Sequence, residues 1–289
     1  MLPRTKTIYE NCRVLDISGN LLFKAGRKRL DWYLSRNLAR EIDRETIQLT
    51  FAHKGTGRST EPFYLQDMRN TCVVCDTPTH LTLHHIVPAQ YRQHMPLEVK
   101  SHSSHDLLPL CTQCHDTYEH HANRLKKHLA ACFAAPLLGV GWVCRPDINK
   151  AAKAAAALLS DTSRIPQPRL CELRQVVRQV CVDRRDLFSP AMQGYLDSVG
   201  DLDDLSENPG LMQELCAIEV RVAGPGFREH GEMVIEAVLG NRVVPGMCRE
   251  CRALMDGGVA AFVGRWRRHF VEHAEPAHLP DHWTVDYPV

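Results

Sequence analysis

The sequence predicts an α+β protein organised around a small domain stapled by cysteines. Two Cys-x-x-Cys pairs lie within the stretch from Thr71 to Leu125, short apolar runs bounded by turn residues precede it, and helical periodicity follows it. We expect a hairpin, helix and strand unit over residues 1–65, the cysteine-stapled domain over 66–135 and a mainly helical region over 147–289.

The N-terminal unit is predicted from alternation and turn residues. Apolar runs between Asn11 and Phe23 are separated by Ser18-Gly19-Asn20, which favours a hairpin. Residues Arg27–Arg44 carry apolar side chains at helical spacing, so we expect a helix there. Ile47–Phe51 is expected to be a short strand.

The four paired cysteines predict a structural zinc site. Cys72 and Cys75 form one knuckle, Cys111 and Cys114 form the other, and 35 residues separate the two knuckles. Two knuckles complete a closed tetrahedron of thiolates around Zn²⁺, which organises the fold and leaves no position open for chemistry. Cys248 and Cys251 form a third pair with no second pair nearby, and we interpret them as reduced structural cysteines.

Three histidines accompany the zinc frame. His84 and His85 end the alternating segment LTLHH, which reads as a strand, so their side chains are expected on opposite faces. His115 follows the last cysteine at the start of a helix, and Glu119 lies one turn further on the same face. A strand and a helix that each carry histidines are a plausible frame for a hydrolytic metal ion.

The C-terminal half is predicted to be helical. Trp266 and Phe270 are expected to be core anchors, whereas Arg265, Arg267 and Arg268 are candidates for a basic ridge. Helices are expected over Asn123–Phe133, Asp147–Leu159 and 166–182, and after Ser189-Pro190.

The stretch from Thr71 to Leu125 resembles the HNH, or ββα-metal, nucleases. A cysteine knuckle, a strand ending in His-His, a loop and the segment DLLPLCTQCH, Asp106–His115, carry the resemblance. It implies that His84 and His115 bind a catalytic divalent ion, Mg²⁺ or Mn²⁺, and that His85 is the general base. Asp106 stands where the family has asparagine, and it is a catalytic candidate although a carboxylate cannot donate the hydrogen bonds of an amide. Glu119 is added as a further metal ligand from helix spacing.

A narrower resemblance covers nearly the whole chain. YENCRVLDISGNLLFKAGRKRLDWYL, KSHSSHDLLPLC and RWRRHFVEHAEPAHLPDHWTVDY are similar to the C-terminal half of the exonuclease 3′-5′ domain-containing protein 2 family. The exonuclease domain of that family would precede residue 1, and its Asp-x-Glu motif has no equivalent here. Exonuclease activity is therefore not expected from this chain.

The leading hypothesis is a metal-dependent HNH endonuclease that hydrolyses phosphodiester bonds in DNA or RNA. The alternative is a catalytically inactive zinc module that binds nucleic acid or docks in a ribonucleoprotein assembly. Residues 1–130 carry 18 lysines and arginines against 13 acidic residues, which suits a polyanionic partner. The candidates for phosphate binding are Arg92, Lys100, Arg124, Lys126 and Lys127.

Composition also bounds the setting of the protein. The 12 cysteines include metal-type pairs, and no apolar signal segment occupies the N-terminus, so we expect reduced thiols and an intracellular location in the nucleus, the cytosol or an organelle matrix. No run approaches the roughly 18 apolar residues that a membrane span needs. The helical C-terminal region is a candidate surface for a protein partner.

Overall fold

The computed structural model describes residues 3–52, 61–101, 103–199 and 208–288, without the side chains of residues 100, 101, 103 and 104. It divides into two compact units, and the first comprises residues 1–138 and 229–289 while the second comprises 139–228. This division differs from the predicted single region over 147–289, because the last sixty or so residues share a hydrophobic core with the cysteine-stapled domain.

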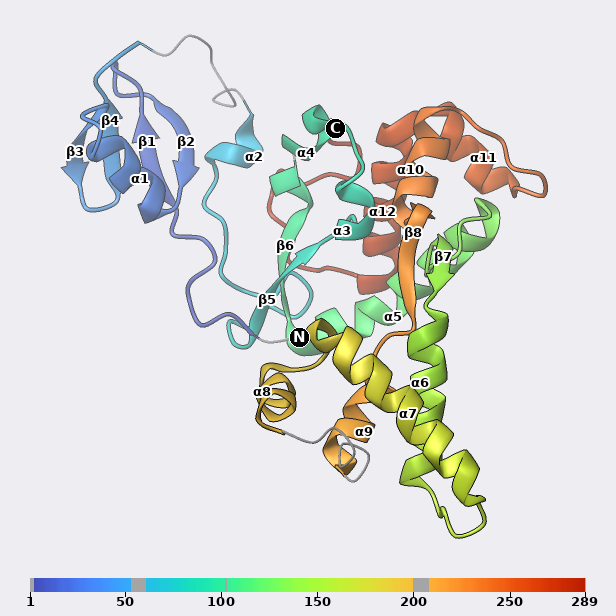
Figure 1. Ribbon diagram of the computed structural model, residues 1–289. Coiled ribbons are helices and arrows are strands. Elements are labelled where there is room, and N and C mark those ends of the chain that lie inside the picture. The colour runs from blue at the N-terminus through green and yellow to red at the C-terminus, as the bar shows by residue number, and fades with distance from the viewer. Residues whose placement is uncertain (1–2, 53–60, 102, 200–207, 289) are drawn as a thin grey trace. The chain divides into compact units, whose positions relative to one another are not determined.

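A four-stranded sheet opens the first unit (Figure 1). Its strands are β1 (Cys12–Leu15), β2 (Leu21–Ala25), β3 (Ala39–Asp43) and β4 (Thr46–Leu49), in the order β2-β1-β4-β3. The predicted hairpin is confirmed by the antiparallel pairing of β1 with β2. The predicted helix over 27–44 is wrong in its second half, since α1 (Arg27–Leu34) ends before Asn37, which has a positive φ of 56°, and β3 follows.

The centre of the first unit is a hairpin followed by a long helix (Figure 1). Strands β5 (Leu81–His85) and β6 (Leu107–Cys111) pair antiparallel, with His84 opposite Leu108 and His85 opposite Leu107. Helix α5 (Thr112–Cys132) starts directly after β6, and its buried stripe includes His115, Tyr118, Ala122, Leu125 and Leu129. Short elements connect these strands and the first sheet: α2 (Pro62–Leu65), α3 (Ala89–Arg92), α4 (Leu97–Ser101) and η1 (Ser103–Asp106).

The C-terminal helices pack onto this hairpin and helix. They are α10 (His230–Leu239), α11 (Arg249–Asp256) and α12 (Gly258–Ala274). Trp266 and Phe270 of α12 are fully buried, which confirms the prediction that they anchor the core. Gly231 lies so close to the carbonyl oxygen of Gln90 that a Cβ atom would stand 1.7 Å from it, so α10 approaches α3 only because this residue has no side chain.

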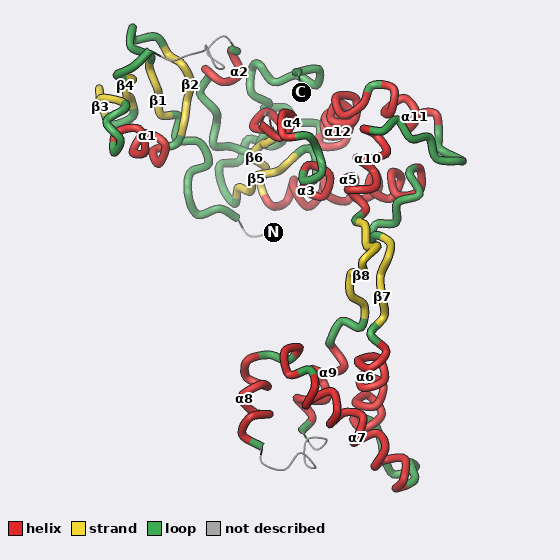
Figure 2. Tube along the Cα trace, turned by 45° about the horizontal axis from the view of Figure 1, so that its top comes forward, coloured by secondary structure: helices red, strands yellow, loops and turns green. Residues whose placement is uncertain are grey.

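The second unit is a helical cluster carried on a β-ribbon. Strands β7 (Val140–Cys144) and β8 (Arg221–Arg228) pair antiparallel and enclose the helices in sequence (Figure 2). The helices are α6 (Pro146–Leu159), α7 (Gln167–Asp183), η2 (Arg185–Leu187), α8 (Pro190–Ser198) and α9 (Pro209–Ala217). The predicted helices over 147–159 and 166–182 are confirmed, and Ser189 caps α8 by accepting a hydrogen bond from the Met192 amide. Among the described residues, no helix has both the length and the apolar character required to cross a membrane.

Candidate metal centre

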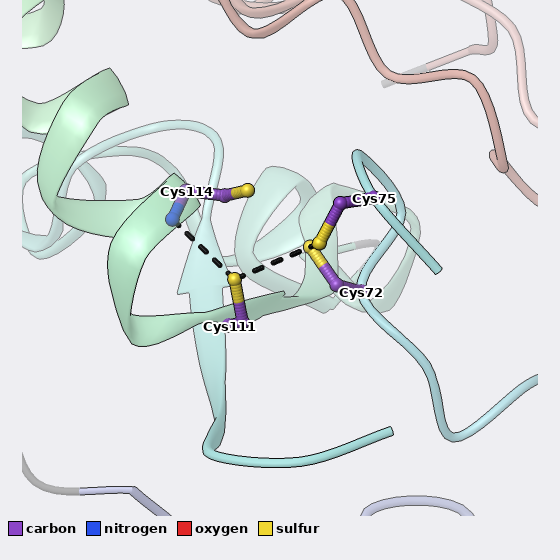
Figure 3. A group of neighbouring side chains, drawn as sticks. All are labelled: Cys72, Cys75, Cys111 and Cys114. Carbon is purple, nitrogen blue, oxygen red and sulfur yellow. Dashed lines mark hydrogen bonds between the residues drawn. The ribbon is translucent and has the colours of Figure 1, made fainter. Parts of the chain in front are cut away.

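The four predicted zinc cysteines converge at one end of the β5–β6 hairpin (Figure 3). The Sγ atoms of Cys75 and Cys111 lie 3.8 Å apart, and the Cys114 amide donates to the Cys111 Sγ at 3.4 Å. Sulfurs bound to one tetrahedral zinc ion at 2.3 Å would lie about 3.8 Å apart. The thiol set thus fits a closed Cys₄ zinc site that joins the loop before β5 to the start of α5.

A second group of possible metal ligands lies between β5, which carries His84, and α5, which carries His115 and Glu119. His84 Nδ1 lies 3.0 Å from His115 Nε2, and Glu119 Oε1 lies 3.8 Å from His115 Nε2 and 4.0 Å from His84 Nδ1. Both imidazoles are buried, while the Glu119 side chain remains about one-third exposed. The structure therefore brings together the three residues that sequence reasoning assigned to a divalent ion.

Thr82 fixes the tautomer of His115. Its hydroxyl donates to the Leu110 carbonyl at 2.8 Å, so its oxygen can only accept from His115 Nδ1, 2.7 Å away. A neutral His115 then presents a lone pair at Nε2, toward His84 and Glu119. Because side chains alternate along a strand, Thr82 and His84 share the face of β5 that packs on α5.

The charge state of the group suits a divalent ion. Burial and the nearby His115 lower the pKa of His84 to about 3, so this imidazole is neutral at physiological pH. The nearby His115, together with Lys126 and His84, lowers the pKa of Glu119 to about 2 against the effect of partial burial. Two imidazole nitrogens and one carboxylate are a donor set that fits a divalent transition-metal ion.

His85 projects from the opposite face of β5. Its side chain is half-buried, and burial together with the charge of Arg92 lowers its pKa to about 4. Its Nδ1 is buried and has no hydrogen-bond partner among the described residues. His85 is therefore a neutral base with one ring nitrogen uncommitted, on the face that the expected alternation gave it.

Asp106 is held by Arg267, a candidate for a basic ridge in the sequence that the structure buries instead. Arg267 of α12 donates from Nε to Oδ1 at 2.6 Å and from Nη2 to Oδ2 at 3.0 Å, and both side chains are buried. Burial raises the pKa of Asp106, but the nearby His105 and the hydrogen-bonded Arg267 outweigh it and hold this pKa below the usual value. Both carboxylate oxygens of Asp106 thus serve to anchor α12 to the segment before β6.

The predicted phosphate ligands differ in their surroundings. Arg92 lies near His85, is partly buried and donates from Nε to the Val87 carbonyl. Lys126 is engaged by Glu119, with 3.4 Å between Nζ and Oε2. Arg124 and Lys127 are exposed on α5, and Lys100 lies in α4 with a side chain outside the described residues. Arg92 is the candidate that lies closest to the chemistry expected of His85.

Sequence reasoning missed two residues that shape this centre. Thr82 could have been found, because it lies two positions before His84 on the same face of an expected strand. Arg267 could not, since 161 residues separate it from Asp106 and helical periodicity says nothing of such a pairing.

The fold and the site together describe an α+β chain whose central hairpin and long helix carry clusters of potential metal ligands. Comparison with known proteins narrows this description. The chain is 29% identical over 292 residues to human exonuclease 3′-5′ domain-containing protein 2, with 98% of this chain and 41% of the human protein covered. The protein of that name from Drosophila melanogaster is 28% identical over 291 residues, with 98% and 44% covered. Protein RRP6-like 3 of Arabidopsis thaliana is 27% identical over 372 residues, with 97% and 40% covered.

The chain thus spans about two-fifths of the length of these curated relatives. No family model matches it, and no solved structure matches it.

Proposed function

We propose that this chain is a metal-dependent endonuclease that hydrolyses phosphodiester bonds in DNA or RNA through an HNH-type site. The observation that carries the proposal is the convergence of His84, His115 and Glu119 on one face of β5, with His85 on the strand beside them. A structural zinc held by the four cysteines would tie β5, β6 and α5 together around this group.

The roles of the side chains follow from their environments. A divalent ion held by His84, His115 and Glu119 would supply a Lewis acid for the charge that develops on the phosphate and the leaving oxygen. His85 would take the proton from the attacking water, since its depressed pKa keeps it in the base form at neutral pH. Arg92, near His85, would hold a phosphate oxygen by its guanidinium.

The names of the relatives support a nucleic-acid-cleaving role. Three of them are named for an exonuclease domain, and this chain matches less than half the length of each. The endonuclease reaction proposed here rests on the histidine group, not on those names.

A second candidate is a catalytically inactive zinc module that binds nucleic acid or docks in a ribonucleoprotein assembly. The favouring observation is that the chain itself packs over His84: its ring stacks on Phe270 of α12, with 5.6 Å between ring centroids, and meets Tyr118 edge to face. The commitment of both Asp106 oxygens to Arg267 favours this candidate as well. A domain kept for binding alone would tolerate both features.

A closed circular substrate separates the candidates. A circular single strand of DNA or RNA has no ends, so only an endonuclease converts it to a linear product. The purified chain with Mn²⁺ or Mg²⁺ should linearise the circle, EDTA should stop the reaction, and His115→Ala should abolish it. His120→Ala, an exposed histidine on the same helix, is the matched control and should cleave normally. Binding of the circle without cleavage under any of these ions would leave the inactive module as the function.

A further inference from the structure

A third group of metal-type side chains lies at the far end of α5. His128 and Cys132 are four residues apart on this helix, and Cys248 and Cys251 lie at the start of α11. Their four ligand atoms lie within 4.8 Å of one another, and they share no residue with the Cys₄ group or the histidine group. The sequence interpretation of Cys248 and Cys251 as an isolated pair is therefore incomplete, since folding brings two further ligands to them.

The three nitrogen–sulfur distances match one tetrahedral ion. Nε2 of His128 lies 3.6 Å from the Sγ atom of each of the three cysteines. Ligands at 2.3 Å for sulfur and 2.0–2.1 Å for nitrogen around zinc would place each such pair about 3.6 Å apart. The Cys132 and Cys248 sulfurs lie 3.2 Å apart, too far for the roughly 2.05 Å of a disulfide bond.

The Cys248 pair also has the backbone conformation of the Cys111 and Cys114 knuckle. Cys248 is the N-cap of α11, with φ −68° and ψ 159°, and its sulfur accepts the Cys251 amide at 3.4 Å. Cys111 is the N-cap of α5, with φ −68° and ψ 157°, and accepts the Cys114 amide at the same 3.4 Å. Each turn presents two sulfurs to one point and holds the first of them with an amide hydrogen bond.

We propose that His128, Cys132, Cys248 and Cys251 form a second structural zinc site of the Cys₃His type. Three thiolates and one imidazole are the ligands that zinc prefers in a closed tetrahedral site, which leaves no position for a substrate. Mg²⁺ prefers oxygen ligands, and these four side chains offer only sulfur and nitrogen.

The site explains how the first unit closes around an insertion. The whole second unit, residues 139–228, lies between Cys132 and Cys248 in the sequence. A zinc ion here would tie the end of α5 to the start of α11, on either side of that insertion, and would shorten a loop whose closure is costly in entropy. Helix α5 would then carry ligands for both structural zinc sites and for the histidine group between them.

Zinc content and sulfur coordination of the wild-type full-length chain test the proposal. Metal analysis by mass spectrometry should find two tightly bound zinc ions per chain, and Co²⁺ substitution should give thiolate charge-transfer absorption from seven sulfurs instead of four. This readout needs no variant, so it does not depend on whether substitutions fold. It is also independent of nuclease activity, because the histidine group has no thiolate.

Variants locate the second ion. His128→Ala and Cys251→Ala should each lower the zinc content by one ion per chain, and His120→Ala and Cys171→Ala, which change exposed residues of the same types, should leave it unchanged. A single zinc and a four-sulfur cobalt spectrum in the wild type would overturn the proposal. A Cys132–Cys248 disulfide found in the freshly purified, zinc-loaded chain would overturn it as well.

Discussion

Replacing Arg267 with methionine should destabilise the first unit strongly, because it strands a buried carboxylate. The Asp106 and Arg267 side chains are 9% and 2% exposed, and two charge-assisted hydrogen bonds join them. Arg267 also donates from Nη1 to the carbonyl oxygens of Val285 and Tyr287, so the last residues of the chain depend on it as well. Methionine fills much of the same volume and restores none of these bonds.

The expected cost follows from the burial of the pair. Removal of one partner from a buried ion pair typically costs about 3–5 kcal/mol, since the remaining charge loses its compensation. The pair is bidentate and nearly inaccessible, so we expect Arg267→Met to lie within this range. The double variant Asp106→Leu/Arg267→Met removes both charges and should recover a large part of the loss.

Urea unfolding measures this prediction. Tryptophan fluorescence reports the first unit through Trp266 and Trp283, which are both buried, and zinc is kept in excess throughout. Arg268→Met is the matched control, because Arg268 neighbours Arg267 on α12 and is exposed. A loss of unfolding free energy below about 1 kcal/mol for Arg267→Met, or equal losses for Arg267→Met and Arg268→Met, would refute the assignment of Asp106 and Arg267 as a buried anchor.

Three further outcomes are expected. The stability difference between wild type and Arg267→Met should shrink as pH falls below about 4. The pKa of Asp106 is lowered in the folded protein, so its contribution to the free energy of unfolding is present above the unfolded-state pKa and is lost as the carboxyl group protonates. Urea midpoints at several pH values measure this. Thr82→Val should weaken Mn²⁺ binding by about 10–100-fold in calorimetry, since His115 loses the hydrogen bond that fixes its tautomer. Cys75→Ser should remove one zinc ion per chain and lower the melting temperature, as metal analysis and calorimetry would show.

What could be predicted from the sequence was set by short-range spacing. A shared metal site is predicted by the two cysteine pairs, because each pair lies on one turn. The alternation of LTLHH likewise predicts that His84 and His85 lie on opposite faces of a strand. The prediction of one helix over 27–44 was wrong because the apolar spacing continues after Leu34, whereas Asn37 adopts a left-handed conformation that a helix cannot contain.

Long-range partners were beyond such reasoning. Cys248 lies beside His128, 120 residues earlier in the sequence, and the second unit is inserted between them. Arg267 is buried and binds the carboxylate of Asp106 on another element. No hydrophobic periodicity or motif in the sequence predicts either contact. The division of 147–289 between two units was missed for the same reason, since helical spacing identifies a buried face without identifying what covers it.

The most direct test of the proposed function compares wild type with His85→Ala on circular single-stranded DNA and RNA under single-turnover conditions. Mn²⁺ binding and zinc content are measured on both proteins first, so that only the base differs between them. The wild type should linearise the circle, and His85→Ala should bind the same metals and lose about 10²–10⁴-fold in rate, the usual contribution of a general base. Equal rates for the two proteins would contradict the role of His85 and with it the HNH reaction.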